Sequence, residues 1–184
     1  MPKVYPFRAI RYNPAKVPDL TKVTTQPYDR IGPDLQDEYY RRDPRNIVRI
    51  IRAKDEADPM GKYRTAAAAL DEWLRDGTLM QEAKPCLYVY HQIYKAPEGE
   101  RVRKGFSAMV RLEEPGKGKI HPHEETHSGP KVDRLNLLTA TKTHTEQVFL
   151  IYSDPEKRVN KILDSIAART PDLEAKDDLG ETHR

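Results

Sequence analysis

Cys86-Leu-Tyr-Val-Tyr-His-Gln-Ile-Tyr94 decides the fold of this chain, because its side chains alternate with a period of two. Such alternation predicts a β-strand. The polar segment 95–100, which contains Pro97 and Gly99, turns the chain into a second predicted strand, Val102–Leu112. The sequence therefore predicts an antiparallel hairpin at its centre. Cys86, at the start of the first strand, is expected to be a small core residue.

Strands and helices alternate irregularly on either side of this hairpin. Apolar runs predict further strands at Val4–Tyr12, Ile47–Ile51 and Gln147–Tyr152. Helical spacing and terminal residues predict helices at Asp34–Arg42, Lys62–Asp76, Pro130–Thr141 and 155–169. We therefore predict an α+β fold, with a mixed sheet around a central antiparallel hairpin and three to four packed helices. Residues 1–169 are expected to form one domain, and residues 170–184 a polar tail.

The composition describes a protein with a solvated surface. Of 184 residues, 37% are hydrophobic and 33% are charged, and no apolar run has the ~20 residues needed to cross a bilayer. No signal-peptide pattern follows the N-terminus, so a cytoplasmic location without membrane contact is expected. The single cysteine excludes an internal disulfide. The net charge of +3, with interleaved signs, neither requires nor excludes DNA as a partner.

Chemically active side chains are most concentrated between His121 and Asn136. Imidazoles, carboxylates, hydroxyls and cations crowd into these sixteen positions, which lead into a predicted helix. Three interpretations of this segment compete. In the first, His121 and His123 project to the same side of an extended segment and bind a metal together with Glu124. Zinc normally needs a third or fourth protein ligand, and the sequence offers only distant histidines for it.

The second interpretation is an anion site at the start of the helix. A loop containing Thr126 and Ser128 enters a helix whose first turns carry Lys131 and Arg134. Free backbone N–H groups and the helix dipole favour phosphate there. Lys131 would act as a point charge and Arg134 as a bidentate fork, while Glu124 or a neighbouring histidine acts as a general base. The segment lacks the spacing of a Walker loop.

The third interpretation is structural. Asp133 and Arg134 would pair with local charges, and the histidines would be ordinary surface residues. A similar choice applies to Gln26-Pro-Tyr-Asp-Arg30, which is most simply a rigid turn. Alternatively, Tyr28 and Asp29 line the same cleft as the charged segment. Sequence spacing leaves these alternatives open.

Several separated motifs occur in an order that resembles a known family. They are Pro6-Phe-Arg-Ala-Ile10, Pro27-Tyr-Asp29, Leu87-Tyr-Val-Tyr90, His123-Glu-x-Thr126, and Lys131-x-Asp-Arg-Leu135 followed by Leu137-Leu138. Together, over Val4 to Asp154, they resemble the bacterial and archaeal family known as domain of unknown function 1015. That family is distantly similar to the ParB N-terminal and sulfiredoxin superfamily, which includes nucleotide-binding switches and free-serine kinases. The resemblance implies a mixed α+β domain that handles nucleotides or phosphate.

The resemblance also implies roles for individual residues. Glu124 and His123 would be the catalytic pair, and the expected substrate or phosphate contacts are Thr126, Lys131, Asp133, Arg134, Tyr28 and Asp29. A nucleotide with Mg²⁺ is the implied cofactor. Family members typically continue into a Gly-His-His-Arg element, which this sequence lacks. The chain is therefore expected to correspond to an N-terminal part of the family.

Three functions are consistent with these features. The leading expectation is a phosphotransferase-like domain that uses a nucleotide or another phosphate compound and acts on a small hydroxyl-bearing molecule. The second is a nucleotide-gated, ParB-like module that binds DNA or protein. The third is a divalent-metal hydrolase built on His121, His123 and Glu124. The sequence does not indicate the oligomeric state.

Overall fold

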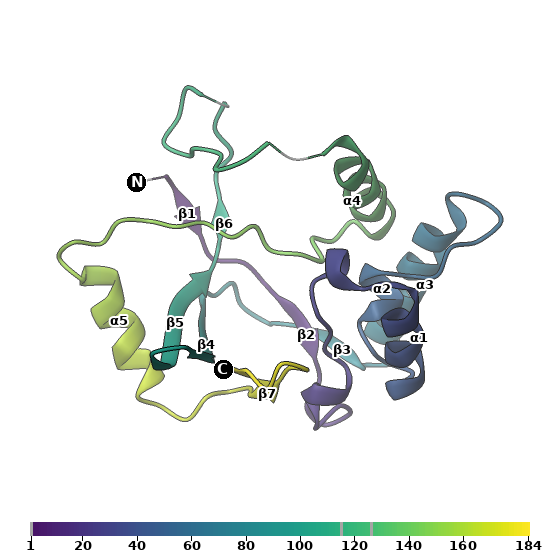
Figure 1. The fold of residues 1–184 in the computed structure, drawn as a ribbon, viewed down its shortest axis with the longest axis horizontal. Helices are drawn as coiled ribbons and strands as arrows, with labels where there is room; N and C mark the ends of the chain where they lie inside the picture. The colour runs from purple at the N-terminus through teal and green to yellow at the C-terminus, as the bar shows by residue number, and fades with distance from the viewer. Residues whose placement is uncertain (1, 115, 126) are drawn as a thin grey trace.

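The structure is a computed structural model that describes residues 2–114, 116–125 and 127–184. Within these ranges the chain forms five α-helices and three small sheets whose strands all pair antiparallel. Figure 1 shows most of the helices gathered on one side of the molecule, with the long hairpin and one further helix on the other. The predicted α+β class is confirmed. No helix in the described ranges is long and apolar enough to span a membrane.

The central hairpin is confirmed and is the longest strand pair. It consists of β4 (Tyr88–Ala96) and β5 (Gly99–Ser107), which pair in continuous register from Tyr88 opposite Ser107 to Ala96 opposite Gly99. Only two residues connect the strands, because Gly99 adopts a φ of +118° that other residues rarely take. Cys86 lies before β4, forms an isolated bridge with Phe7 and is exposed. The prediction that it lies in the core is wrong.

Two predicted strands are each divided into parts. The N-terminal segment forms β1 (Val4–Tyr5) and β2 (Ile10–Tyr12), which pair with β6 (Met109–Val110) and β3 (Leu79–Gln81) respectively. Pro6 lies just after β1, where its missing N–H ends the ladder. The chain after β5 likewise leaves the hairpin and continues as β6 beside β1. The proline thus lets one extended segment serve two sheets.

The helical layer contains most of the apolar core. Its helices are α1 (Pro33–Arg42), α2 (Val48–Ile51) and α3 (Gly61–Arg75), accompanied by the 3-10 turns η1 (Leu20–Lys22) and η2 (Tyr28–Arg30). The buried face of α3 includes Tyr63, Ala66, Leu70 and Trp73, as helical spacing predicts. Trp73 packs with Ile50 and Leu79, which confirms it as a core residue.

The segment Ile47–Ile51 is buried, as predicted, but it forms a helical turn rather than a strand. Buried Asn46 explains the difference, since its side-chain oxygen accepts the N–H of Val48 while its amide donates to the carbonyls of Lys22 and Thr24. The bond from Val48 to Asn46 forms an Asx turn that leads the chain into the helical turn of α2. The apolar run alone does not distinguish the two conformations.

The C-terminal half contains α4 (Ser128–Thr141) and α5 (Arg158–Ala167). Helix α4 begins two residues before the predicted start, and α5 begins three residues after it. The α5 start is fixed by Asp154, whose carboxylate accepts the N–H groups of Arg158, Val159 and Asn160 at 2.9 to 3.0 Å.

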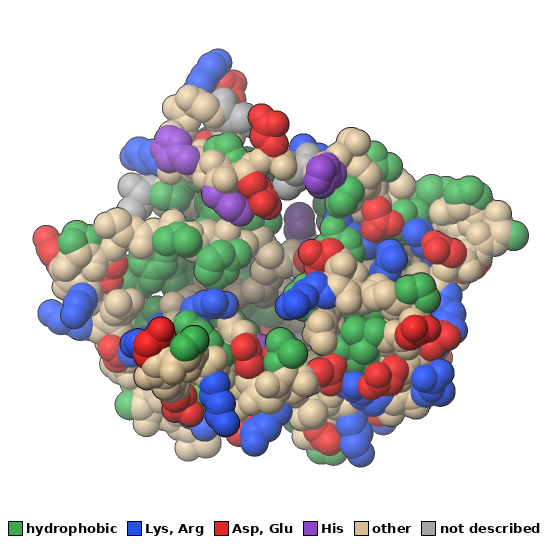
Figure 2. Space-filling view, viewed as in Figure 1, with side chains coloured by type: hydrophobic (Ala, Val, Ile, Leu, Met, Phe, Trp, Pro, Cys, Tyr) green, Lys and Arg blue, Asp and Glu red, His purple; other side chains and the backbone are tan. Residues whose placement is uncertain are grey.

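The segment 147–152, between these two helices, is not the buried strand that its sequence suggests. It carries no regular secondary structure, and the side chains of Val148 and Ile151 are 84% and 87% exposed. In Figure 1 it crosses the molecule between α4 and α5, and hydrophobic side chains appear along this course in Figure 2. Its apolar composition therefore produces a surface rather than a core strand.

Residues 170–184 join the sheet of the central hairpin. They form β7 (Ala175–Lys176) and β8 (Thr182–His183), and β8 pairs with β4 through Gln92 opposite His183. Asp178, in the intervening turn, accepts hydrogen bonds from Tyr39 and Arg42 on α1. The polar tail thus connects the hairpin to the helical layer (Figure 1).

Candidate functional site

The loop before α4 holds the first half of the charged segment at the surface. His121, His123 and Glu124 are all exposed, and Nε2 of His123 lies 3.5 Å from Oε1 of Glu124. These three residues do not bring ligand atoms together as a metal site would require, so the arrangement of the loop does not favour the metal-hydrolase alternative. Thr126 lies outside the described residues. Histidine side chains are prominent on this face of the molecule (Figure 2).

The amino end of α4 is open to ligands. The helix starts at Ser128 after His127, whose side chain makes no capping hydrogen bond, and its first turn contains no acidic residue. Ser128, Gly129 and Lys131 are exposed. The N–H groups of Ser128 and Gly129 lack intrahelical acceptors, whereas Pro130 has no N–H, so this end presents two backbone donors and a partial positive charge beside a lysine.

One turn further along α4, Arg134 is held on several sides by the protein. Its Nη1 donates to the carbonyl of Ile51 at 3.1 Å and to Oε1 of Glu146 at 2.6 Å. Its Nε and Nη2 donate to Asp133, and its guanidinium carbon lies 3.8 Å from the ring centroid of Tyr28. Because four donor contacts and a stacking face are already used, Arg134 positions α4 rather than serving as a free phosphate fork.

Asp133 connects α4 to α3. Its Oδ1 accepts a 2.7 Å hydrogen bond from the hydroxyl of Tyr63 and lies 3.4 Å from Nζ of Lys62. Burial alone would raise the pKa of Asp133, but hydrogen bonds from Arg134 and Tyr63 and the nearby positive charges outweigh it and lower that pKa. Asp133 is therefore an ionised anchor at neutral pH.

The pKa of Glu146 is shifted in the opposite direction to that of Asp133. Burial raises the pKa of Glu146, and the attraction of Arg134 offsets only part of that rise. Burial also raises the pKa of Tyr28, against the opposing charge of Arg134. A cavity of about 10 Å³, room for about one water molecule, lies beside Asp133 and Arg134. We call this compact polar cluster the Arg134 clamp, and it has no space for a substrate. Its members are Tyr28, Lys62, Tyr63, Asp133, Arg134 and Glu146.

The structure thus divides the predicted site residues into two groups. Tyr28, Asp133 and Arg134 come together, and Asp29 adjoins Tyr28 with its side chain at the surface. By contrast, Lys131 lies in the exposed first turns of α4.

Sequence reasoning missed three members of the clamp, namely Lys62, Tyr63 and Glu146. Tyr63 could be identified only as a member of the apolar face of α3. Glu146 stands alone in a polar stretch, where neither periodicity nor spacing distinguishes it.

Comparison with known families gives one match. A family model described as a protein of unknown function (DUF1015) matches residues 4–184. The chain belongs to this family. The match confirms the resemblance that the motifs indicate and extends it from Asp154 to residue 184. Searches of curated proteins and of solved structures returned no match.

Proposed function

We propose that this chain is a phosphate-handling domain in which the amino end of α4 binds the phosphate groups of a nucleotide. Its phosphotransferase-like reaction would act on a small hydroxyl-bearing molecule. The observation that carries the proposal is the start of α4, where the His127 side chain makes no capping hydrogen bond, the first turn contains no acidic residue and Lys131 is exposed. Helix ends of this kind favour phosphate through backbone donors and the helix dipole.

The proposed proton-transfer group is Glu124, paired with His123 at 3.5 Å. Both side chains are exposed, which leaves them accessible to a substrate hydroxyl delivered to this face. Glu124 would accept the hydroxyl proton while Lys131 and the α4 amides neutralise charge on the transferring phosphoryl group. Mg²⁺ would accompany the nucleotide. The clamp around Arg134 would support this end of α4 by fixing the helix to α2.

A nucleotide screen by thermal shift tests the binding step. We expect one class of nucleotide, with Mg²⁺, to raise the melting temperature of the wild type, because a ligand that binds only the native state stabilises it. Lys131→Ala should reduce the shift. Lys161→Ala is the matched control, because Lys161 is an exposed lysine at the fourth position of α5, whose amino end Asp154 already caps.

Turnover with the nucleotide identified in that screen tests the chemical step. Glu124→Gln should abolish product formation while leaving the nucleotide-induced shift intact, since the amide keeps the shape but cannot accept a proton. Undiminished turnover in Glu124→Gln would contradict the proposed role of Glu124 as the proton acceptor. If no nucleotide raises the melting temperature, the proposal that this domain binds a nucleotide is wrong.

The alternative is a nucleotide-gated, ParB-like binding module. The exposed apolar segment Val148–Tyr152 favours it, because a continuous apolar stretch at the surface is typical of interaction sites. This function predicts nucleotide binding without turnover, together with retention of DNA or a protein partner. Retention on DNA would weaken steeply with salt.

A further inference from the structure

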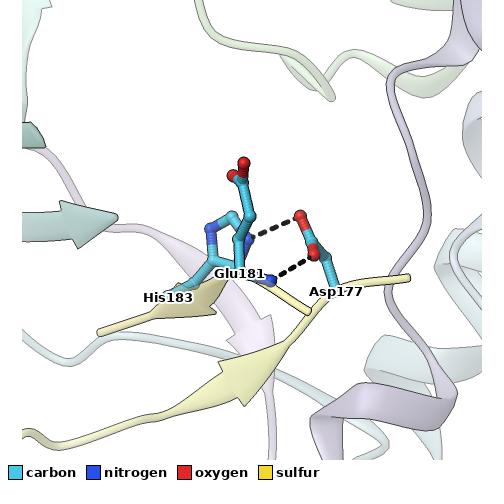
Figure 3. Close-up of side chains that lie close together, drawn as sticks. All are labelled: Asp177, Glu181 and His183. Carbon is cyan, nitrogen blue, oxygen red and sulfur yellow. Dashed lines mark hydrogen bonds and ion pairs between the residues drawn. The ribbon is translucent and has the colours of Figure 1, made fainter. Parts of the chain in front are cut away.

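A second group of chemically active side chains lies far from α4 in the sequence, in the hairpin formed by β7 and β8. Asp177, Glu181 and His183 each offer a ligand atom, and these atoms lie within 4.8 Å of one another. Nε2 of His183 is 3.1 Å from Oδ2 of Asp177. Figure 3 shows the three side chains on the β7–β8 hairpin, with Asp177 facing the imidazole of His183. All three are partly buried.

Each of these side chains is oriented by a partner outside the group. The hydroxyl of Tyr90 on β4 contacts Nδ1 of His183, and the two rings stack with centroids 5.9 Å apart. Gln92, also on β4, donates its amide N–H to Glu181. Oδ1 of Asp177 accepts the backbone N–H of Leu179 at 2.9 Å. Metal ligands characteristically have such supporting partners, which fix the imidazole ring and aim the carboxylates.

The charge of the group is also unbalanced. Neither Asp177 nor Glu181 forms an ion pair with a lysine or arginine in the part of the chain that the structure describes. The neighbouring acids differ, since Asp178 pairs with Arg42 and Glu174 with Arg184. Two partly buried carboxylates next to a single imidazole favour an added cation.

We propose that Asp177, Glu181 and His183 bind a divalent transition metal of the zinc type. Nε2 of His183 and one oxygen from each carboxylate would be the ligands, with water in the remaining position. Two ligand atoms on a tetrahedral zinc are roughly 3.3 Å apart, close to the 3.1 Å between His183 and Asp177. An imidazole among the ligands favours zinc-like ions over Mg²⁺ or Ca²⁺, which prefer oxygen.

Binding would replace the hydrogen bond between His183 and Asp177 with two metal bonds. Nε2 would ligate the metal through its lone pair, because only a ring nitrogen without a proton can do so. The neutral ring would then carry its proton on Nδ1 and donate it to the oxygen of Tyr90. The bound ion would then cross-link the β7–β8 turn to β8. This site is independent of the phosphate site proposed at α4.

Calorimetric titration of the full chain with ZnCl₂ tests the proposal. One equivalent should bind. Both His183→Ala and Glu181→Gln should weaken binding at least tenfold. Glu181→Gln retains a side-chain oxygen that can accept from Gln92, so it tests the ligand even if His183→Ala perturbs the hairpin. Circular dichroism checks that both variants fold.

Two exposed histidines supply the controls. His144→Ala should leave the titration unchanged, and so should His121→Ala in the loop before α4. Co²⁺ in place of zinc should give visible absorption bands that disappear in His183→Ala. Sub-stoichiometric binding, or binding that His121→Ala abolishes and Glu181→Gln leaves unchanged, would overturn the proposal.

Discussion

At the scale of single residues, Arg134 shows how an interaction partner changes a predicted role. Its position in the first turns of a helix suggests a phosphate contact. In the structure its guanidinium is bound to Asp133, Glu146 and the carbonyl of Ile51. Lys131, three positions earlier, remains exposed. Sequence spacing predicts where these cations lie along the helix, but only packing decides which one is free to bind a ligand.

Arg134→Ala is expected to lower the free energy of unfolding by about 1–3 kcal/mol, because it leaves partly buried Glu146 without its cation and removes two hydrogen bonds that Asp133 accepts. Urea denaturation measures the loss. The control is Arg158→Ala, whose side chain is exposed and lies 4.0 Å from its acidic neighbour, and a change within about 0.5 kcal/mol is expected. Equal losses of stability in the two variants would contradict the claim that the contacts of Arg134 stabilise the fold.

The lowered pKa of Asp133 gives a pH dependence with a definite sign. A carboxyl whose pKa is lower in the folded state stabilises the protein above its unfolded pKa of about 4, and this contribution is lost as pH falls through the folded pKa. Melting temperatures measured from about pH 6 down to pH 3 should therefore fall more steeply for the wild type than for Asp133→Asn. Parallel curves would show that Asp133 is not stabilised by its partners.

At the scale of secondary-structure elements, local pattern predicts the hairpin and α3 well. The alternation in residues 86–94 is long enough to predict β4, and the Trp73 face of α3 has clear helical spacing. Short apolar runs behave differently. Residues 48–51 become helical after an Asx turn formed by Asn46, and residues 147–152 pair with no strand. In both cases the deciding interaction comes from outside the run.

Substitution of Asp178 tests the connection between residues 170–184 and α1. Asp178→Ala removes the acceptor shared by Tyr39 and Arg42 and should cost about 1–2 kcal/mol of unfolding free energy. Asp172→Ala, an exposed acid in the same tail, should change stability by less than about 0.5 kcal/mol. Hydrogen exchange should also show faster exchange in β8 of Asp178→Ala. Unchanged exchange and stability would mean that the tail is held by strand pairing alone.

At the scale of the whole molecule, the burial of apolar residues is uneven. Val48 and Ile50 lie in the helical layer and are almost fully buried, whereas Val148 and Ile151 are among the most exposed apolar residues described. Composition alone cannot show this difference, because both segments are apolar runs of similar length. The location of the core depends on which elements pack together.

Single substitutions distinguish these two segments. Val148→Lys and Ile151→Lys should each change the free energy of unfolding by less than about 0.5 kcal/mol, because neither side chain is buried. Ile50→Ala should cost about 2–5 kcal/mol. Thermal or urea denaturation compares them. Severe destabilisation by Ile151→Lys would show that this segment is packed in solution.

The proposed function depends on one structural feature, the open amino end of α4, and His127→Asp tests it directly. His127 occupies the N-cap position with extended backbone angles, so an aspartate there can accept the N–H of Gly129 and place a negative charge at the helix end. We predict that His127→Asp stabilises the ligand-free protein by about 0.5–2 kcal/mol and abolishes the nucleotide-induced thermal shift that Lys161→Ala retains. A nucleotide shift that survives in His127→Asp would contradict phosphate binding at α4.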